Sequence, residues 1–519
     1  MRAVAIRRAT REERPGPRRE SRPRPRPAPM LVVLVTLVAH QPVAPATITV
    51  DDACSLADAI TSANTDTATG GCTAGSGVDQ IVLTAPVTLT EELPIVTSEV
   101  LIDGQGHAIS RDDAAPAFRI LAFALNGDVA LHNTTVSNGI AERGGGVYSD
   151  TTNLDVVDSR IVGNQASLRG GGLFGAYGTF AITLVNTTVS GNHTDGDGGG
   201  LFAPYLSNVF IESSTISNNF AGDDGGGVST DMYTTTTITN STVSGNIALD
   251  KGGGLYNAYY SDVMTLTSTT VSGNQAPEGG GVYAFPYFGN TPAGHYTYLV
   301  LENSIVAGNT TGGNCRAQFQ IDEGGNFDDD GSCLGASPIA AGVDFDAMLA
   351  DNGGPTLTHA LLPGSVAIDA AGDCGLAVDQ RGFARTPPCD SGSVELGAAP
   401  VGGSVSLIEG HRATCLNLTT GSEVSFVLAP GATSWDCEAN GLGVVAGDIV
   451  RQTVTGVSSG GAGGTVIGLA ARRASCRNLT TGQSVAIDLS TGPSWDCVSA
   501  GLGVSRGDRV RQDSLGAVF

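Results

Sequence analysis

Asn240-Ser-Thr-Val-Ser-Gly-Asn246 and, after five intervening residues, Gly252-Gly-Gly-Leu-Tyr256 form one copy of a repeat that occurs seven times between residues 131 and 309. Two other copies begin Asn186-Thr-Thr-Val-Ser-Gly-Asn192 and Ser268-Thr-Thr-Val-Ser-Gly-Asn274. Successive triple glycines start 26 to 28 residues apart. A nearly constant period of this length is typical of a solenoid, in which each repeat packs on its neighbours.

Alignment of the copies separates columns of different chemistry. One column is entirely aliphatic: Val136, Ile161, Val189, Ile216, Val243, Val271 and Val306. Around it, apolar residues alternate with Thr, Ser or Asn, a pattern of period two that indicates β-strands. We therefore expect an all-β fold, with a right-handed parallel β-helix of ~27-residue coils over residues 81–314 and small β modules after it.

A second column consists of asparagines: Asn164, Asn192, Asn219, Asn246, Asn274 and Asn309. Asn tolerates left-handed backbone, and stacked amides can hydrogen-bond to one another. We expect a corner ladder of amides, next to a tight turn that the glycines permit. Both columns are interpreted as scaffold.

Charge excludes some classes of partner. The 519 residues carry a net charge of −24, but residues 1–46 contain ten Arg and three Glu, which leaves −31 for the remainder. Such a surface repels nucleic acid and anionic membranes and attracts cations such as Ca²⁺.

The N-terminus and the cysteines both indicate export. Residues 1–46 combine an Arg/Pro-rich lead, an apolar run from Met30 to Ala39 and Ala44-Pro-Ala46, the pattern of a signal peptide, and no later segment predicts a membrane span. Ten cysteines fall into five local pairs without metal-site spacing, which favours disulfides in an oxidising compartment. The pairs are Cys54 with Cys72, Cys315 with Cys333, Cys374 with Cys389, Cys415 with Cys437, and Cys476 with Cys497.

Two regions resemble modules of secreted bacterial proteins. Cys54-Ser-Leu-Ala-Asp-Ala-Ile60 resembles the CSLREA domain, which implies an N-terminal cap over residues 47–80. Four motifs in order resemble the choice-of-anchor Q domain over residues 315–399, and they imply a secreted or surface protein of the bacterial envelope. They are Asp351-Asn-Gly-Gly-Pro-Thr-Leu-Thr-His359, Pro363-Gly-Ser-Val-Ala-Ile-Asp369, Asp379-Gln-Arg-Gly-Phe383 and Cys389-Asp-Ser-Gly-Ser-Val-Glu395.

The C-terminal part contains one module twice, over residues 400–459 and 460–519. Each copy contains Ser-Trp-Asp-Cys and Gly-Leu-Gly-Val. Alternating Val and Ser around turns predict two β-sandwich-like units with one disulfide each. Trp435 and Trp495 either stack on sugars or pack on these disulfides.

An acidic column precedes the triple glycines, and stacking would bring Asp197, Asp223, Asp224 and Asp250 close to Lys251. Neighbouring carboxylates repel unless a cation joins them, and hard oxygen ligands suit Ca²⁺. Resemblance to pectate-lyase-type β-helices would further imply catalysis, with Lys251 as the base beside Asp224. The alternative is a solvated surface on which these charges pair across coils.

A set of tyrosines follows the glycines by a few residues: Tyr177, Tyr205, Tyr233, Tyr259 and Tyr287. We expect them on one face, where exposed rings suit contact with sugars or peptides. The alternative is that loops cover them.

Three functions remain open at this point. The first is a non-catalytic, adhesin-like protein that binds an extracellular polysaccharide or a host or cell-envelope surface. The second is a Ca²⁺-dependent polysaccharide lyase or hydrolase. The third is a structural stalk that displays the C-terminal modules.

Overall fold

The computed structural model describes residues 45–396, except 178, 180, 259–262 and 285–296, and most of the backbone of residues 402–518. Within this part of the chain, no helix has the length and hydropathy needed to cross a membrane.

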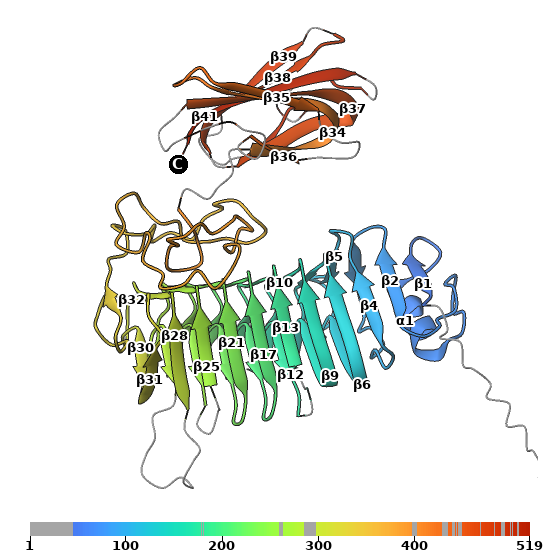
Figure 1. The fold of residues 1–519 in the computed structure, drawn as a ribbon. Helices are drawn as coiled ribbons and strands as arrows, with labels where there is room; N and C mark the ends of the chain where they lie inside the picture. The colour runs from blue at the N-terminus through green and yellow to red at the C-terminus, as the bar shows by residue number, and fades with distance from the viewer. Residues whose placement is uncertain are drawn as a thin grey trace, which may run out of the picture. The chain divides into compact units, whose positions relative to one another are not determined.

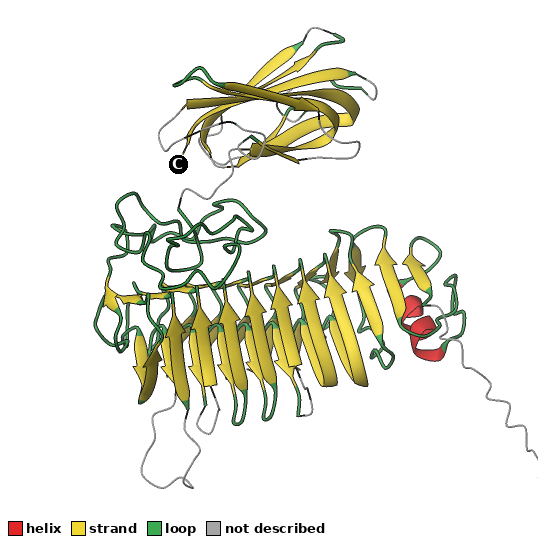
Figure 2. Cartoon of the chain, in the orientation of Figure 1, coloured by secondary structure: helices red, strands yellow, loops and turns green. Residues whose placement is uncertain are grey.

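The described chain begins with a short cap. Strand β1 (Thr47–Val50) pairs in parallel with β2 (Asp79–Leu83), and helix α1 (Leu56–Thr65) lies between them in sequence. The Ser55 hydroxyl accepts a hydrogen bond from the main-chain N–H of Asp58 at 3.1 Å, which caps the helix. Figure 2 shows this helix at the N-terminal end of the solenoid. A terminal cap of this kind covers apolar groups that have no next coil to pack on.

The middle of the chain is a parallel β-solenoid, as predicted (Figure 1). Three sheets follow its length. The first is the largest and includes β1 and β2. Two of its strands, β6 (Leu121–His132) and β9 (Val147–Val157), are long, and each spans the positions that two shorter strands occupy in later coils. Its further strands are β4 (Val100–Asp103), β12 (Leu173–Gly175), β13 (Ala181–Val185), β16 (Leu201–Ala203), β17 (Asn208–Glu212), β20 (Val228–Thr230), β21 (Thr235–Thr239), β24 (Leu255–Asn257), β25 (Val263–Thr267), β27 (Val282–Ala284), β28 (Tyr298–Glu302), β30 (Cys315–Ala317) and β31 (Phe319–Asp322).

The second sheet contains the Thr-Val-Ser strands of the repeat. Its members are β3 (Val87–Leu89), β5 (Ala108–Arg111), β7 (Thr135–Ser137), β10 (Arg160–Val162), β14 (Thr188–Ser190), β18 (Thr215–Ser217), β22 (Thr242–Ser244), β26 (Thr270–Ser272), β29 (Ile305–Val306), β32 (Phe327–Asp328) and β33 (Ser337–Pro338). The third and shortest sheet precedes the triple glycines. It contains β8 (Ile140–Arg143), β11 (Gln165–Arg169), β15 (His193–Thr194), β19 (Phe220–Ala221) and β23 (Ile247–Ala248).

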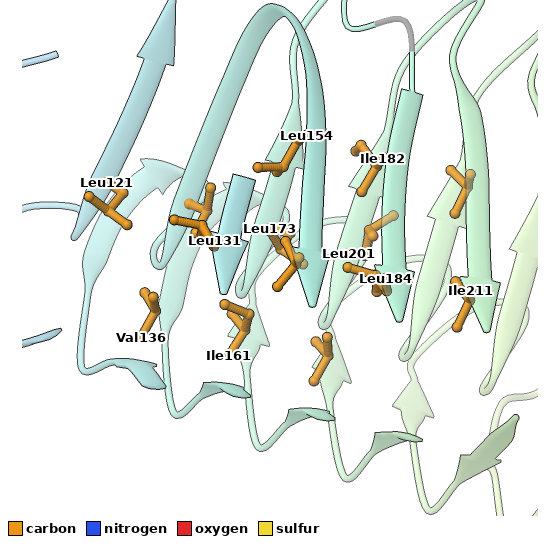
Figure 3. Packing of buried hydrophobic residues seen from close by; sticks show 14 of the residues in the cluster. Leu121, Leu131, Val136, Leu154, Ile161, Leu173, Ile182, Leu184, Leu201 and Ile211 are labelled. Carbon is orange, nitrogen blue, oxygen red and sulfur yellow. The ribbon is translucent and has the colours of Figure 1, made fainter. Parts of the chain in front are cut away.

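The aliphatic columns form the core. Ile161 is paired in register with Val136 on one side and Val189 on the other, and all three side chains are fully buried. Figure 3 shows this stacking for Val136 and Ile161, and the same arrangement for Leu154 and Ile182. Each buried aliphatic side chain stabilises the fold by about 1.5–3 kcal/mol relative to exposure, so a continuous ladder makes neighbouring coils depend on one another.

The asparagine column is a buried ladder of amides. Asn192 Nδ2 donates to Asn219 Oδ1 at 2.9 Å, and Asn219 Nδ2 donates to Asn246 Oδ1 at 2.9 Å. The left-handed residue of this corner is the one before the asparagine, for example Gly245 with φ 66°. The predicted ladder is confirmed, and the backbone conformation that we had expected of the asparagines belongs to their neighbours.

Residues 337–396 are mostly turns and lie against the second sheet. Gln380 Nε2 donates to the main-chain oxygen of Ser214 at 3.1 Å and to Thr215 Oγ1 at 2.9 Å. Thr242 Oγ1 bonds Gln380 Oε1 at 2.6 Å. The outward Thr hydroxyls of β18, β22 and β26 are therefore buried under this segment rather than hydrated.

The C-terminal residues form an antiparallel sheet of eight strands. They are β34 (Gly402–Asn417), β35 (Glu423–Val427), β36 (Ser434–Asp436), β37 (Ile449–Ile467), β38 (Leu469–Asn478), β39 (Ser484–Asp488), β40 (Ser494–Asp496) and β41 (Arg509–Val518). Strands of both sequence copies join one sheet, where two sandwich-like units had been expected, because the long β37 runs through both copies and pairs with β34 and β41. The side chains of Trp435 and Trp495 lie outside the described residues.

All five predicted cysteine pairs form disulfides. Each closes a loop of 15 to 22 residues within one local element. Loops of this length restrict the unfolded chain by about 3 kcal/mol each. The bonds fit an oxidising, extracellular environment.

Candidate ligand-binding face

A row of aromatic rings follows the outer surface of the largest sheet. Tyr148, Phe174 and Phe202 are in register on β9, β12 and β16, with ring centroids 5.6 and 5.4 Å apart and nearly parallel planes. Tyr256 and Tyr283 continue the row with centroids 5.6 Å apart. Neighbouring parallel strands lie about 4.8 Å apart, so rings at the same register position come close enough to stack on one another.

Arginine side chains from the adjacent corner of the solenoid cover some of these rings. Arg143 lies over the ring of Phe174 at 5.9 Å, and Arg169 lies over Phe202 at 4.7 Å. Phe202 is 3% exposed as a result. Because neighbouring rings and guanidinium groups occupy the ring faces, these aromatics are not a platform for stacking a ligand.

The row is interrupted at Ser229, and an acidic cluster lies beside the interruption. Carboxylate oxygens of Asp197, Asp223 and Asp224 lie within 4.8 Å of one another. Asp197 Oδ2 forms an ion pair with Arg169 Nε at 2.9 Å. Burial raises the pKa of Asp224 to about 6, and it also raises the pKa of Asp197. Three of the four predicted aspartates are therefore together, while the fourth, Asp250, pairs with Lys251.

The donor set suits a hard cation. Three carboxylates converge, and the Oδ1 atom of Asp224 is buried without a hydrogen-bond donor among the described residues. Ca²⁺ accepts six to eight oxygen ligands, so water would complete its shell. The ammonium group of Lys251, 3.9 Å from Asp224 Oδ1, competes for the same charge.

Lys251 is held in its charged form. Burial by itself lowers the pKa of Lys251, but its hydrogen bond to Asp250 and the charge of Asp224 outweigh burial and raise that pKa. A general base at neutral pH requires a pKa near 7. Lys251 in this arrangement donates a hydrogen bond to a carboxylate and stays charged, so it does not act as the base.

Three of the five predicted tyrosines, Tyr177, Tyr205 and Tyr233, lie in loops between strands of the largest sheet. Tyr177 lies between β12 and β13 and is 71% exposed. One coil later, Tyr205 is 37% exposed and packs edge-to-face on Tyr233, with centroids 5.2 Å apart. Tyr259 and Tyr287 lie outside the described residues. The two exposed rings belong to adjacent coils and could contact one extended ligand.

A pocket that we had not predicted lies at the N-terminal end of the aromatic row. It has a volume of about 340 Å³ and is lined by Ala122, Ala124, Arg119, Arg143 and Tyr148, among others. The sequence did contain a signal, since Ala122 pairs with Tyr148 and therefore occupies the aromatic column one coil earlier.

Comparison with protein-family models, with curated proteins and with solved structures found no match. The CSLREA and choice-of-anchor Q resemblances stay predictions. Function is therefore inferred from the geometry of this chain.

Proposed function

We propose that this protein is a secreted or surface-displayed bacterial solenoid that binds an extracellular polysaccharide, or a host or cell-envelope surface bearing one, without catalysing a reaction. The observation that carries the proposal is the pair of exposed rings on adjacent coils, Tyr177 and Tyr205. Beside the acidic cluster, Lys251 is ion-paired with Asp224 and Asp250, which keeps its ammonium group charged. Lys251 in this state is charged and does not remove a proton, while the carboxylates of Asp197, Asp223 and Asp224 have the charge to bind a cation.

Exposed rings on a rigid scaffold support binding. Tyr177 and Tyr205 project from loops whose flanking strands are fixed by pairing to the coils on either side. A flat amphipathic ring contributes contact area at little conformational cost, because tyrosine has two side-chain torsions. Five disulfides support location outside the cytoplasm.

A binding experiment tests the proposal. We expect the full chain to bind at least one of pectin, alginate, mannan or xylan in biolayer interferometry, and the double variant Tyr177→Ala/Tyr205→Ala to bind at least tenfold more weakly. Loss of about 1.4 kcal/mol gives a tenfold change, which two aromatic contacts can supply. Tyr298→Ala is the matched control, because Tyr298 lies on strand β28 outside these loops.

Two outcomes would contradict the proposal. A Ca²⁺-dependent rise in unsaturated-uronate absorbance with pectin or alginate, lost in Lys251→Ala, would establish the lyase alternative, for which the Asp197, Asp223 and Asp224 cluster is the supporting observation. Binding to none of the polysaccharides would favour the structural stalk.

We further propose that the acidic cluster binds Ca²⁺, and we expect 10 mM Ca²⁺ to raise the melting temperature of EDTA-treated protein. Sites of extracellular modules have dissociation constants of about 10⁻⁴–10⁻³ M, so linkage predicts about 1.4–2.7 kcal/mol of added stability. Differential scanning calorimetry measures the shift. Asp223→Asn should abolish it, and an exposed carboxylate elsewhere, as in Asp128→Asn, should not. An equal shift in Asp223→Asn would place the ion elsewhere.

A further inference from the structure

The pocket beside Tyr148 exists because one position of the aromatic column holds a small residue. Strands β6 and β9 are in parallel register, with Leu121 opposite Val147 and Ala122 opposite Tyr148. From β9 to β27, which carries Tyr283, every strand of this column has an aromatic residue at the position of Ala122, except β20, which has Ser229. Ala122 and Ala124 instead leave a depression of about 340 Å³, within the range of ligand pockets.

The pocket wall contains two cations and two carboxylates. Arg119 contacts Glu92 at 3.7 Å, and Arg143 contacts Glu142 at 3.6 Å. Both distances are longer than an ordinary hydrogen bond. Among the described residues, these four side chains have no hydrogen-bond partner in the protein. Their guanidinium donors and carboxylate acceptors therefore remain available to a ligand.

One edge of the pocket is also ordered by an aromatic ring. Arg119 lies 4.6 Å from the ring centroid of Tyr148, whose other face stacks on Phe174. This cation–π contact holds the guanidinium group at the pocket edge and uses none of its N–H groups as hydrogen-bond donors. Ala122, Ala124 and Ile95 supply the apolar part of the lining.

We propose that this pocket binds one neutral sugar ring of a polysaccharide, an inference that rests on the proposed glycan-binding function and adds a subsite to it. A pyranose offers a C–H face to the apolar part of the lining and hydroxyl groups, each both donor and acceptor, to the walls. The two arginines and two glutamates of the wall sum to no net charge, so the wall attracts an anionic or a cationic unit no more than it repels that unit. A polyhydroxy ligand can donate hydrogen bonds to the two carboxylates and accept hydrogen bonds from the two guanidinium groups.

Titration calorimetry of the full chain with hexasaccharides tests this subsite. The probes are cellohexaose, mannohexaose and xylohexaose as neutral chains, hexagalacturonate as an acidic chain and hexaglucosamine as a basic chain. We expect a neutral probe to bind most tightly, equally well with and without EDTA. Ala122→Tyr should weaken that binding at least tenfold, because a tyrosine there continues the existing column and fills the pocket. Arg119→Gln should also weaken it.

Ala130→Tyr is the matched control, since Ala130 is a partly exposed position on the other end of the same strand β6. Unchanged affinity in Ala122→Tyr with a normal melting temperature, tighter binding of a charged probe, or no binding of any neutral probe would each overturn the inference. Polysaccharide binding that depends on Tyr177 and Tyr205 but not on Ala122 would sink the subsite while leaving the proposed function intact.

Discussion

Asn246→Ala is expected to lower the free energy of unfolding of the solenoid by about 3–5 kcal/mol, because one side chain makes four buried hydrogen bonds. Asn246 Oδ1 accepts from Asn219 N at 3.0 Å and from Asn219 Nδ2 at 2.9 Å. Its Nδ2 atom donates to the main-chain oxygen of Ile216 and to Asn274 Oδ1, both at 2.9 Å. Asn246 is fully buried, so alanine leaves these partners without water or protein to replace the amide.

Urea unfolding followed by two fluorophores measures this loss. All eleven tyrosines lie between residues 148 and 298, whereas the two tryptophans are Trp435 and Trp495, so tyrosine emission follows the solenoid and tryptophan emission the C-terminal sheet. Asn309→Ala, at a partly exposed position near the C-terminal end of the ladder, should cost less, since water reaches the amide at this position. A loss below about 1 kcal/mol in Asn246→Ala would show that the ladder specifies the corner without stabilising it.

The solenoid could be predicted because its determinants are local and repeated. A column such as Val136, Ile161 and Val189 indicates both the strand period and the stacking of coils. A single short apolar run could be a helix or a strand, but seven copies at a constant spacing indicate a strand. The disulfide pairing could also be predicted, since the two cysteines of each pair are close in sequence. Periodicity carries this information independently of any homologous sequence.

The candidate site was predicted less completely, because its geometry depends on what lies between coils. The columns placed Asp197 beside Asp224, but they did not predict the guanidinium groups that lie over the rings of Phe174 and Phe202. The pocket at Ala122 requires register between β6 and β9, which the irregular first coils obscure. Pairing of Gln380 with Thr215 joins residues 165 positions apart, which no local pattern encodes.

Arg385→Met is expected to destabilise the docking of residues 337–396 by about 3–5 kcal/mol, because it removes one partner of a buried ion pair. The Arg385 side chain is 1% exposed and lies 3.4 Å from Glu395, whose side chain is 5% exposed. Its guanidinium group also donates to the main-chain oxygen of Gly392 at 2.7 Å and to Asn240 Oδ1, at the turn before β22, at 3.1 Å. Methionine fills similar volume but leaves the carboxylate of Glu395 buried with fewer donors.

Hydrogen exchange separates this docking from global unfolding. Opening of the segment would expose the Thr242 and Thr270 hydroxyl positions, so amides of β22 and β26 should lose protection in Arg385→Met while those of β7 do not. Arg316→Met, at an exposed position on β30, should leave both unchanged. If charge imbalance is the cause, Arg385→Met/Glu395→Leu should recover part of the loss, since replacing both partners of a buried pair is often neutral. A double variant as unstable as the single one would instead assign the effect to the bonds to Gly392 and Asn240, of which the second ties the segment directly to the solenoid.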